Sequence, residues 1–124
     1  MIYSIGIDLV QIRRIRAALD RYGDKFAKRI LGEKEWEIYL ERLDKANFLS
    51  GRFAAKEAVM KTLLSYFEHG ELYYKSVQIL NDIYGMPYVH LEDTDRERIF
   101  KKEVKISISH EREIAAAVAI MTGD

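Results

Sequence analysis

The sequence predicts a single α+β domain spanning residues 1–124, and three observations support this fold class. The length suits one hydrophobic core and is short for two domains. Hydrophobic residues make up 48% of the chain and charged residues 32%, which is typical of a globular protein. Apolar residues recur at helical spacing in the first half, and two pairs of apolar runs around polar turns follow in the second. The expected order is therefore strand, helices, hairpin, short helix, hairpin.

The N-terminal segment predicts a strand followed closely by a helix. Residues 2–10 (IYSIGIDLV) mix β-branched residues with one glycine and alternate weakly, which favours a strand that ends near Asp8. From Val10 to about Tyr22 apolar residues recur every three or four positions, so a helix is expected there. Gly23 is expected to end it, because glycine readily adopts the conformation that closes a helix.

Two shorter helices and one long helix are expected next. The shorter helices lie between residues 26 and 43 and are separated near Gly32. Residues 47–51 then lead into a long helix over residues 51–63 (GRFAAKEAVMKTL). Alanine and apolar side chains cover nearly its whole circumference, so this helix should be buried.

The second half predicts two β-hairpins separated by a polar segment. After a loop around FEHGE (67–71), two apolar runs flank a polar turn, and Pro87 lies where the second strand begins, a position that tolerates proline. Residues 92–103 (EDTDRERIFKKE) indicate a short helix or a solvated loop. The segments VKISIS and IAAAVAIM, joined by HERE, predict the second hairpin at the C-terminus.

Composition excludes several classes of function. Twenty basic and twenty acidic residues cancel, so no net field would attract nucleic acid or an anionic membrane. The chain lacks the run of roughly 20 apolar residues that spans a membrane and lacks signal-peptide features, so we expect a cytoplasmic protein. Cysteine is absent, and His69, His90 and His110 have no metal-ligand spacing. Any bound metal would need oxygen ligands, which favours Mg²⁺.

Glu57 and Lys61 lie one turn apart on the long helix, about 40° apart around its axis. Two interpretations are open. The residues could form an ordinary i,i+4 ion pair on a solvated face, which would contribute roughly 0.3–0.5 kcal/mol. Their neighbours are apolar or small, however, and a buried charge is costly unless it is paired or holds a metal. The sequence is therefore equally compatible with a structural ion pair and with an active site at these two residues.

Asp8 and the end of the SISH segment supply further candidates. Asp8 would either cap the following helix or provide, with Glu57, two carboxylate ligands for a hard metal ion. His110 is either a turn residue or a donor of a charge-assisted hydrogen bond to phosphate, to which Ser109 could add a neutral one. A P-loop or other glycine-rich nucleotide motif is absent.

A third candidate group is basic. Arg14, Arg21 and Lys25 are spaced i, i+7 and i+11, which aligns them on one face if the helix continues past Gly23. Such a line is either a solvated face or a basic stripe that docks an acidic partner and sets its orientation.

Three motifs together resemble the holo-acyl-carrier-protein synthases, the small class of 4'-phosphopantetheinyl transferases. They are IGIDLVQIRRI near the start, GRFAAKEAVMK in the middle and ISISH before an alanine-rich strand. The resemblance covers nearly the whole chain in motif order and spacing. It implies an antiparallel sheet with a long central helix, assembled as a homotrimer. The implied reaction transfers the phosphopantetheine arm of coenzyme A to a serine of apo-acyl carrier protein, in support of fatty acid biosynthesis.

The resemblance also assigns roles at the reacting end. Asp8 and Glu57 would bind Mg²⁺ together with diphosphate oxygens and water, Lys61 would bind phosphate, and His110 would assist at the diphosphate. Either Glu57 or a water on the metal would accept the serine proton. Such chemistry depends on positioning and charge neutralisation more than on a protein nucleophile.

The resemblance also implies roles for residues that are distant from the metal. Each site would sit between two subunits, with Gly85 and Pro87 of a neighbour's hairpin on the adenine side. Arg14 and Arg21 would dock the acidic carrier protein.

Two departures from the family pattern fall on the nucleotide side. Residues 62–76 (TLLSYFEHGELYYKS) are longer and more aromatic than the usual glycine-rich turn, and Met86 stands where lysine is common. They motivate an alternative hypothesis, a non-catalytic α+β module that binds carrier protein or nucleotide without turnover.

Overall fold

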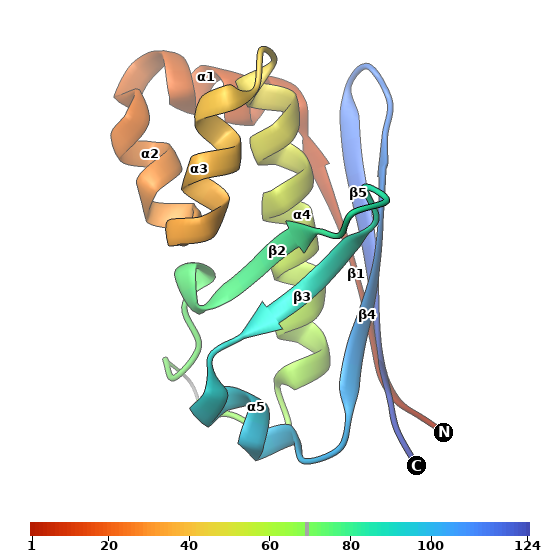
Figure 1. Cartoon of the computed structure of the whole chain (residues 1–124). Helices are drawn as coiled ribbons and strands as arrows, with labels where there is room; N and C mark the ends of the chain where they lie inside the picture. The colour runs from red at the N-terminus through yellow and green to blue at the C-terminus, as the bar shows by residue number, and fades with distance from the viewer. Residues whose placement is uncertain (69) are drawn as a thin grey trace.

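A computed structural model describes residues 1–68 and 70–124, so His69 lies outside the described residues. A three-stranded antiparallel sheet forms one layer, and the long helix α4 (Lys45–Leu63) lies along its face (Figure 1). The strand order is β1 (Ile2–Gln11), β5 (Ile114–Thr122), β4 (Glu103–His110). The predicted α+β class and the C-terminal hairpin of β4 and β5 are confirmed.

The remaining elements also match the predicted order. The N-terminal helices are α1 (Ile12–Tyr22), α2 (Asp24–Ile30) and α3 (Glu33–Glu41). A 3₁₀ helix, η1 (Tyr74–Ser76), leads into the second sheet, an antiparallel hairpin of β2 (Val77–Asn81) and β3 (Pro87–Leu91). The short helix α5 (Asp93–Ile99) connects this hairpin to β4.

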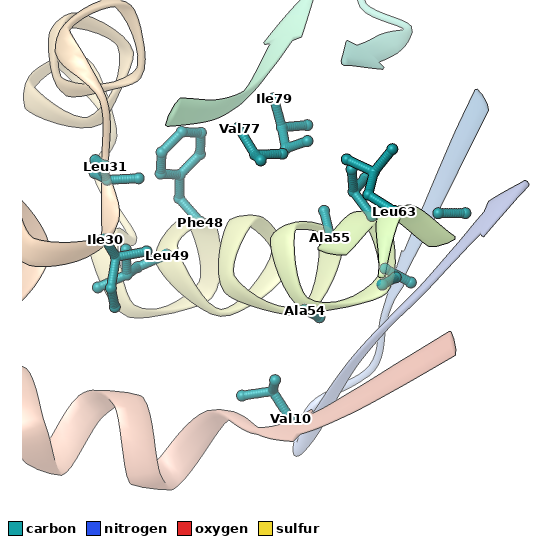
Figure 2. Close-up of a cluster of buried hydrophobic side chains, with 14 of the residues drawn as sticks. Val10, Ile30, Leu31, Phe48, Leu49, Ala54, Ala55, Leu63, Val77 and Ile79 are labelled. Carbon is teal, nitrogen blue, oxygen red and sulfur yellow. The ribbon is translucent and has the colours of Figure 1, made fainter. Parts of the chain in front are cut away.

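Apolar contacts on two opposite sides explain why α4 is apolar around its circumference. Ala55 lies on the side of Val77 and Ile79 of β2, whereas Ala54 lies on the side of Val10 of β1 (Figure 2). Both alanines are fully buried. The predicted burial of this helix is confirmed, and its cause is that the sheet covers one side and the β2–β3 hairpin the other.

Small residues let α4 approach the sheet closely. Ala115, Ala117 and Ala119 of β5 face the helix and are buried. A Cβ atom on Gly6 would lie 2.2 Å from the carbonyl oxygen of Ala58, a separation that real Cβ atoms do not show. This close approach places the inward-facing residues of β1 within side-chain reach of the C-terminal half of α4.

The predicted boundary between β1 and α1 is wrong. β1 continues past Asp8 to Gln11, because its pairing with β5 extends that far. The backbone N–H of Ile12 then donates to the carbonyl oxygen of Glu113 at 2.9 Å, and α1 begins at Ile12. The strand end therefore depends on a partner strand that lies far away in the sequence.

The start of α4 also differs from the prediction. The helix begins at Lys45, and the carboxylate of Asp44 caps it by accepting a hydrogen bond from the backbone N–H of Asn47 at 3.0 Å. Gly51 lies inside the helix instead of at its start. A Cβ atom there would lie 2.5 Å from Nε2 of His110, so this glycine makes room for an imidazole from β4.

Candidate active site

Asp8 points from β1 toward α4. In the sheet it shares a row with Ala117 of β5 and Ile108 of β4, and this row faces the helix. Its side chain is 19% exposed. The helix-capping interpretation of Asp8 is wrong, because Gln11 occupies the N-cap position of α1.

Lys61 reaches from α4 to β1. Its Nζ donates to the carbonyl oxygen of Ile7 at 2.8 Å and to Oδ1 of Asp8 at 3.3 Å. Within the described residues its ion-pair partner is Asp8, so the helix-surface pair with Glu57 does not form. About half of the Lys61 side chain is exposed, which leaves the ammonium accessible to an anionic ligand.

Glu57 is held by an aromatic residue that the sequence analysis missed. The phenol of Tyr74 donates to Oε1 of Glu57 at 2.5 Å. Burial raises the pKa of Tyr74 to about 12, and the hydrogen bond to Glu57 and the charges of Glu57 and Asp8 act in the same direction. The phenol therefore stays protonated and donates to the carboxylate at neutral pH. Only the aromatic character of residues 62–76 pointed to this segment.

The carboxylates of Asp8 and Glu57 are close enough to repel each other. The pKa of Asp8 is raised, chiefly by burial, and the charge of Glu57 adds to the effect, whereas the hydrogen bond and charge of Lys61 oppose it. A divalent cation between two such carboxylates would relieve the repulsion.

The donor set fits Mg²⁺ on chemical grounds, since Asp8 and Glu57 are hard oxygen ligands. Within the described residues no cluster of three or more His, Cys, Asp or Glu side chains could hold a metal alone. Mg²⁺ is usually bound by one or two carboxylates together with phosphate oxygens and water, so two protein ligands suffice. The site is therefore suited to an ion that arrives with a phosphate-bearing substrate.

His110 lies apart from this group within the single chain. It is two strands across and two residues along from Asp8, so their Cα atoms are roughly 12 Å apart. His110 and Gly85 instead line a hollow of about 790 Å³ that also includes Arg52. The structure therefore divides the predicted site residues into two groups.

Arg52, which the sequence analysis missed, is a buried cation at this hollow. Its guanidinium lies 4.6 Å from the ring centre of Phe48 and donates to the side chain of Asn81. Burial lowers the pKa of Arg52 to about 10, and the charge of Glu35 opposes this. Within the described part of the chain its Nε has no hydrogen-bond partner. A buried guanidinium with spare donor capacity favours an anionic ligand here.

Ser109 and Pro87 belong to neither group in the single chain. Ser109 shares a row with Leu9 and Ala116 on the face of the sheet turned away from α4. Pro87 begins β3 and lines a separate hollow between β3, α5 and β4.

The basic stripe is only partly formed. Arg14 and Arg21 are exposed on α1. The helix ends at Tyr22, and Gly23 follows with a φ of 63°, so Lys25 belongs to α2. The expected end of the helix at Gly23 is confirmed, so the condition under which Lys25 would align with the two arginines on one helical face is not met.

A buried ion pair occupies the position next to Glu57 on α4. Lys56 and Glu35 are both fully buried and bonded to each other. Lys56 also donates to the carbonyl oxygens of Tyr74 at 2.6 Å and Val77 at 2.7 Å. Burial lowers the pKa of Lys56 to about 8, and the charge of Glu35 opposes this. The sequence analysis missed the pair, because 21 residues separate its members and no periodic pattern connects them.

Comparison with known proteins identifies the family. Residues 4–119 match the 4'-phosphopantetheinyl transferase superfamily, and the chain therefore belongs to this superfamily. The holo-[acyl-carrier-protein] synthase of Chlorobium limicola is 42% identical over 119 residues, which cover 96% of this chain and 93% of that protein.

Solved structures agree with the sequence comparison. The holo-[acyl-carrier-protein] synthase of Helicobacter pylori, in complex with coenzyme A, aligns with a TM-score of 0.84 and 30% identity, covering 96% of this chain and 100% of that one. The holo-(acyl-carrier-protein) synthase of Bacillus anthracis, in complex with CoA (3',5'-ADP), aligns with a TM-score of 0.81 and 32% identity, covering 100% and 99%. The resemblance stated from the three sequence motifs is confirmed.

Proposed function

We propose that this chain is a Mg²⁺-dependent holo-acyl-carrier-protein synthase. It transfers the 4'-phosphopantetheine moiety of coenzyme A to a serine of apo-acyl carrier protein, giving holo-acyl carrier protein and adenosine 3',5'-bisphosphate. This reaction supports fatty acid biosynthesis. The convergence of Asp8, Glu57 and Lys61 between β1 and α4, in a chain of this superfamily, carries the proposal. Relatives that are holo-acyl-carrier-protein synthases, two of them solved with coenzyme A or its nucleotide, support it.

The chain's own residues have distinct roles in this proposal. Asp8 and Glu57 would hold Mg²⁺, which when bound neutralises charge on the diphosphate of coenzyme A. Lys61 is half-exposed and already extends over Asp8, so its ammonium can donate to a phosphate oxygen on the solvent side. Tyr74 keeps the Glu57 carboxylate in place. These groups position and stabilise charge, which is what phosphoryl-type substitution requires.

An uncovered apolar face supports assembly as a homotrimer. Ile5, Ile7 and Leu9 of β1 are 63–66% exposed on the side of the sheet turned away from α4. Ala116, Val118 and Ile120 of β5 continue the same rows and are half-buried. Contiguous exposed apolar surface of this kind marks an interface.

A shared site between subunits would also explain the divided site residues. His110 and Gly85 lie in a hollow separate from Asp8 within one chain, and Ser109 and Pro87 lie outside both. We place the hairpin of one subunit, with Gly85 and Pro87, against the metal residues of its neighbour. Light scattering should then give three times the mass of the chain, and a monomer that is fully active would contradict this arrangement.

Carrier-protein docking is assigned to the basic residues of the first two helices. Arg14 and Arg21 are exposed on α1, and Lys25 is exposed at the start of α2. Cations in this position would attract an acidic carrier protein and set its orientation and association rate more than its affinity.

Cytoplasmic localisation stays a prediction of the sequence. A bilayer-crossing helix would have to be longer and more apolar than any helix in the described part of the chain.

Transfer can be tested by intact-mass spectrometry. Pure protein, coenzyme A and Mg²⁺ are incubated with apo-acyl carrier protein, and we expect the carrier to gain one phosphopantetheinyl group. Replacing Mg²⁺ with a chelator should abolish the gain. Calorimetry in parallel measures coenzyme A binding. Tight binding without transfer to any carrier, unaffected by Mg²⁺, would instead select the non-catalytic module.

A further inference from the structure

Tyr74 is fixed by contacts that converge on it from two consecutive residues of α4. Its phenol donates to Oε1 of Glu57 at 2.5 Å, and its backbone carbonyl accepts from Nζ of Lys56 at 2.6 Å. The ring packs against Phe53, with ring centres 5.3 Å apart. Both ends of the tyrosine are therefore tied to the helix that carries the acid.

The Lys56 contact is itself rigidly built. Lys56 is fully buried and uses its three donors on Glu35 and on the carbonyl oxygens of Tyr74 and Val77. Glu35 in turn accepts from the backbone N–H of Ile79 at 2.9 Å. A satisfied buried network of this kind leaves few alternative arrangements. It fixes η1 and the start of β2 relative to α4.

We infer that Tyr74 is a positioning residue for Glu57, held in place by the buried Lys56–Glu35 pair. Its phenol occupies Oε1 and thereby restricts the carboxylate to one orientation, which leaves Oε2 for a metal ion. This inference deepens the proposed function, on which its metal readout rests. It assigns a role to the aromatic segment that distinguishes this chain from the usual glycine-rich turn.

The physical reason is preorganisation. A glutamate side chain has three rotatable bonds, and binding an ion would otherwise require it to lose that freedom. A hydrogen bond from a neighbouring group orients a ligating carboxylate before the ion arrives, and removal of such a partner typically weakens metal affinity or activity 10–100-fold. A tyrosine hydroxyl is protonated at neutral pH, so the phenol can donate to the Glu57 carboxylate in ordinary assay buffers.

Tyr74→Phe tests the inference, because it removes the hydroxyl and keeps the ring that packs on Phe53. Tyr73→Phe is the matched control, since Tyr73 is the adjacent residue and is 67% exposed. Transfer is measured while Mg²⁺ is varied at saturating coenzyme A and carrier protein. For Tyr74→Phe we expect the half-saturating Mg²⁺ concentration to rise roughly tenfold. The rate at saturating Mg²⁺ should stay within about twofold, and Tyr73→Phe should match the wild type throughout.

A half-saturating Mg²⁺ concentration that is equal in Tyr74→Phe and Tyr73→Phe would overturn the inference, whatever happens to the rate. Calorimetry gives a readout besides activity: the tightening of coenzyme A binding by Mg²⁺ should shrink in Tyr74→Phe, while binding in chelator is unchanged.

Crystal structures test the role of Tyr74 without relying on the transfer assay. Without metal, the Glu57 carboxylate should occupy one orientation in the wild type and several in Tyr74→Phe. One unchanged orientation in both, or a wild-type Tyr74 that does not contact Glu57, would overturn it. Complete absence of transfer by the wild type would instead remove the proposed function and leave the crystal structures to decide the role of Tyr74. Should Tyr74→Phe fail to fold, the wild-type structure alone gives that decision.

Discussion

Two lysines of α4 each pair with an acid from another element, and the two pairs have the same chemistry and opposite surroundings. Glu35 and Lys56 are fully buried, and each of the three N–H donors of the lysine ammonium has a partner. Lys61 lies five residues further along α4 and pairs with Asp8 of β1; about half of this lysine is exposed, and its Nζ is 3.3 Å from Oδ1 of Asp8. The first pair has no capacity left for a ligand, whereas the second has.

The difference in burial distinguishes a pair that stabilises the fold from a pair that we propose binds substrate. Removing one partner of a buried ion pair is strongly destabilising, because the remaining charge would be left unpaired in a low-dielectric interior. Because Lys61 is half-exposed, water screens its pairing with Asp8, so the pair contributes little to stability and the lysine can exchange partners. Glu57 lies between the two pairs along α4 and is connected to both, to the buried pair through Tyr74 and to Asp8 by proximity.

The largest effect is a loss of activity and is expected at the two carboxylates near Lys61, those of Asp8 and Glu57. Asp8→Ala or Glu57→Ala should lower transfer roughly a hundred- to a thousandfold, because each removes one of the two protein ligands proposed for the ion that would neutralise the diphosphate. Mass spectrometry of the carrier protein measures the rate. Unfolding curves close to that of the wild type would show that the fold is retained. Wild-type rates in both variants would remove the metal assignment.

The second-largest effect is expected at the buried Lys56–Glu35 pair and concerns stability. Lys56→Met should destabilise the protein by about 3–5 kcal/mol, because it leaves the Glu35 carboxylate buried without its partner. Lys61→Met is the matched control, with the same substitution on the same helix, and should change stability by less than about 1 kcal/mol. Urea unfolding measures both. Equal losses in the two variants would show that burial does not distinguish the pairs.

Local patterns in the sequence were sufficient to predict much of the scaffold. Helical spacing and alternation predicted α4 and both hairpins, because these patterns depend only on which face of an element is buried. Helix geometry also predicted that Glu57 and Lys61 share a face. It could not show that Lys61 bonds across to Asp8, since that contact depends on how closely Gly6 lets β1 approach α4.

The errors have the same origin. Gly51 resembled a helix start from its neighbours alone, yet it lies inside α4 because a histidine from β4 needs the space. The sequence analysis assigned no role to Lys56, because its partner Glu35 is brought to it only when α3 packs against α4 and β2. The surroundings of both residues depend on tertiary contacts between segments that are distant in the sequence. Periodicity within one segment carries no information about those contacts.

The smallest effect concerns stability at Asp8 and has the opposite sign from Lys56→Met. Because the pKa of Asp8 is raised in the folded protein, the folded state retains a proton that the unfolded chain has released at pH values just above 3.8. Stability therefore falls as pH rises through that window, and ionised Asp8 destabilises the protein at neutral pH.

Asp8→Asn should consequently be more stable than the wild type at neutral pH, by less than about 1 kcal/mol because water screens its charged partner Lys61. The gain should vanish in thermal unfolding below pH 3.8, where the wild-type carboxyl is protonated in both states. A variant that is less stable at neutral pH would mean that the Lys61 contact outweighs the burial of the charge. The expected gain in stability would accompany a loss of transfer, because the charge that the fold accommodates poorly is the charge that the metal ion requires.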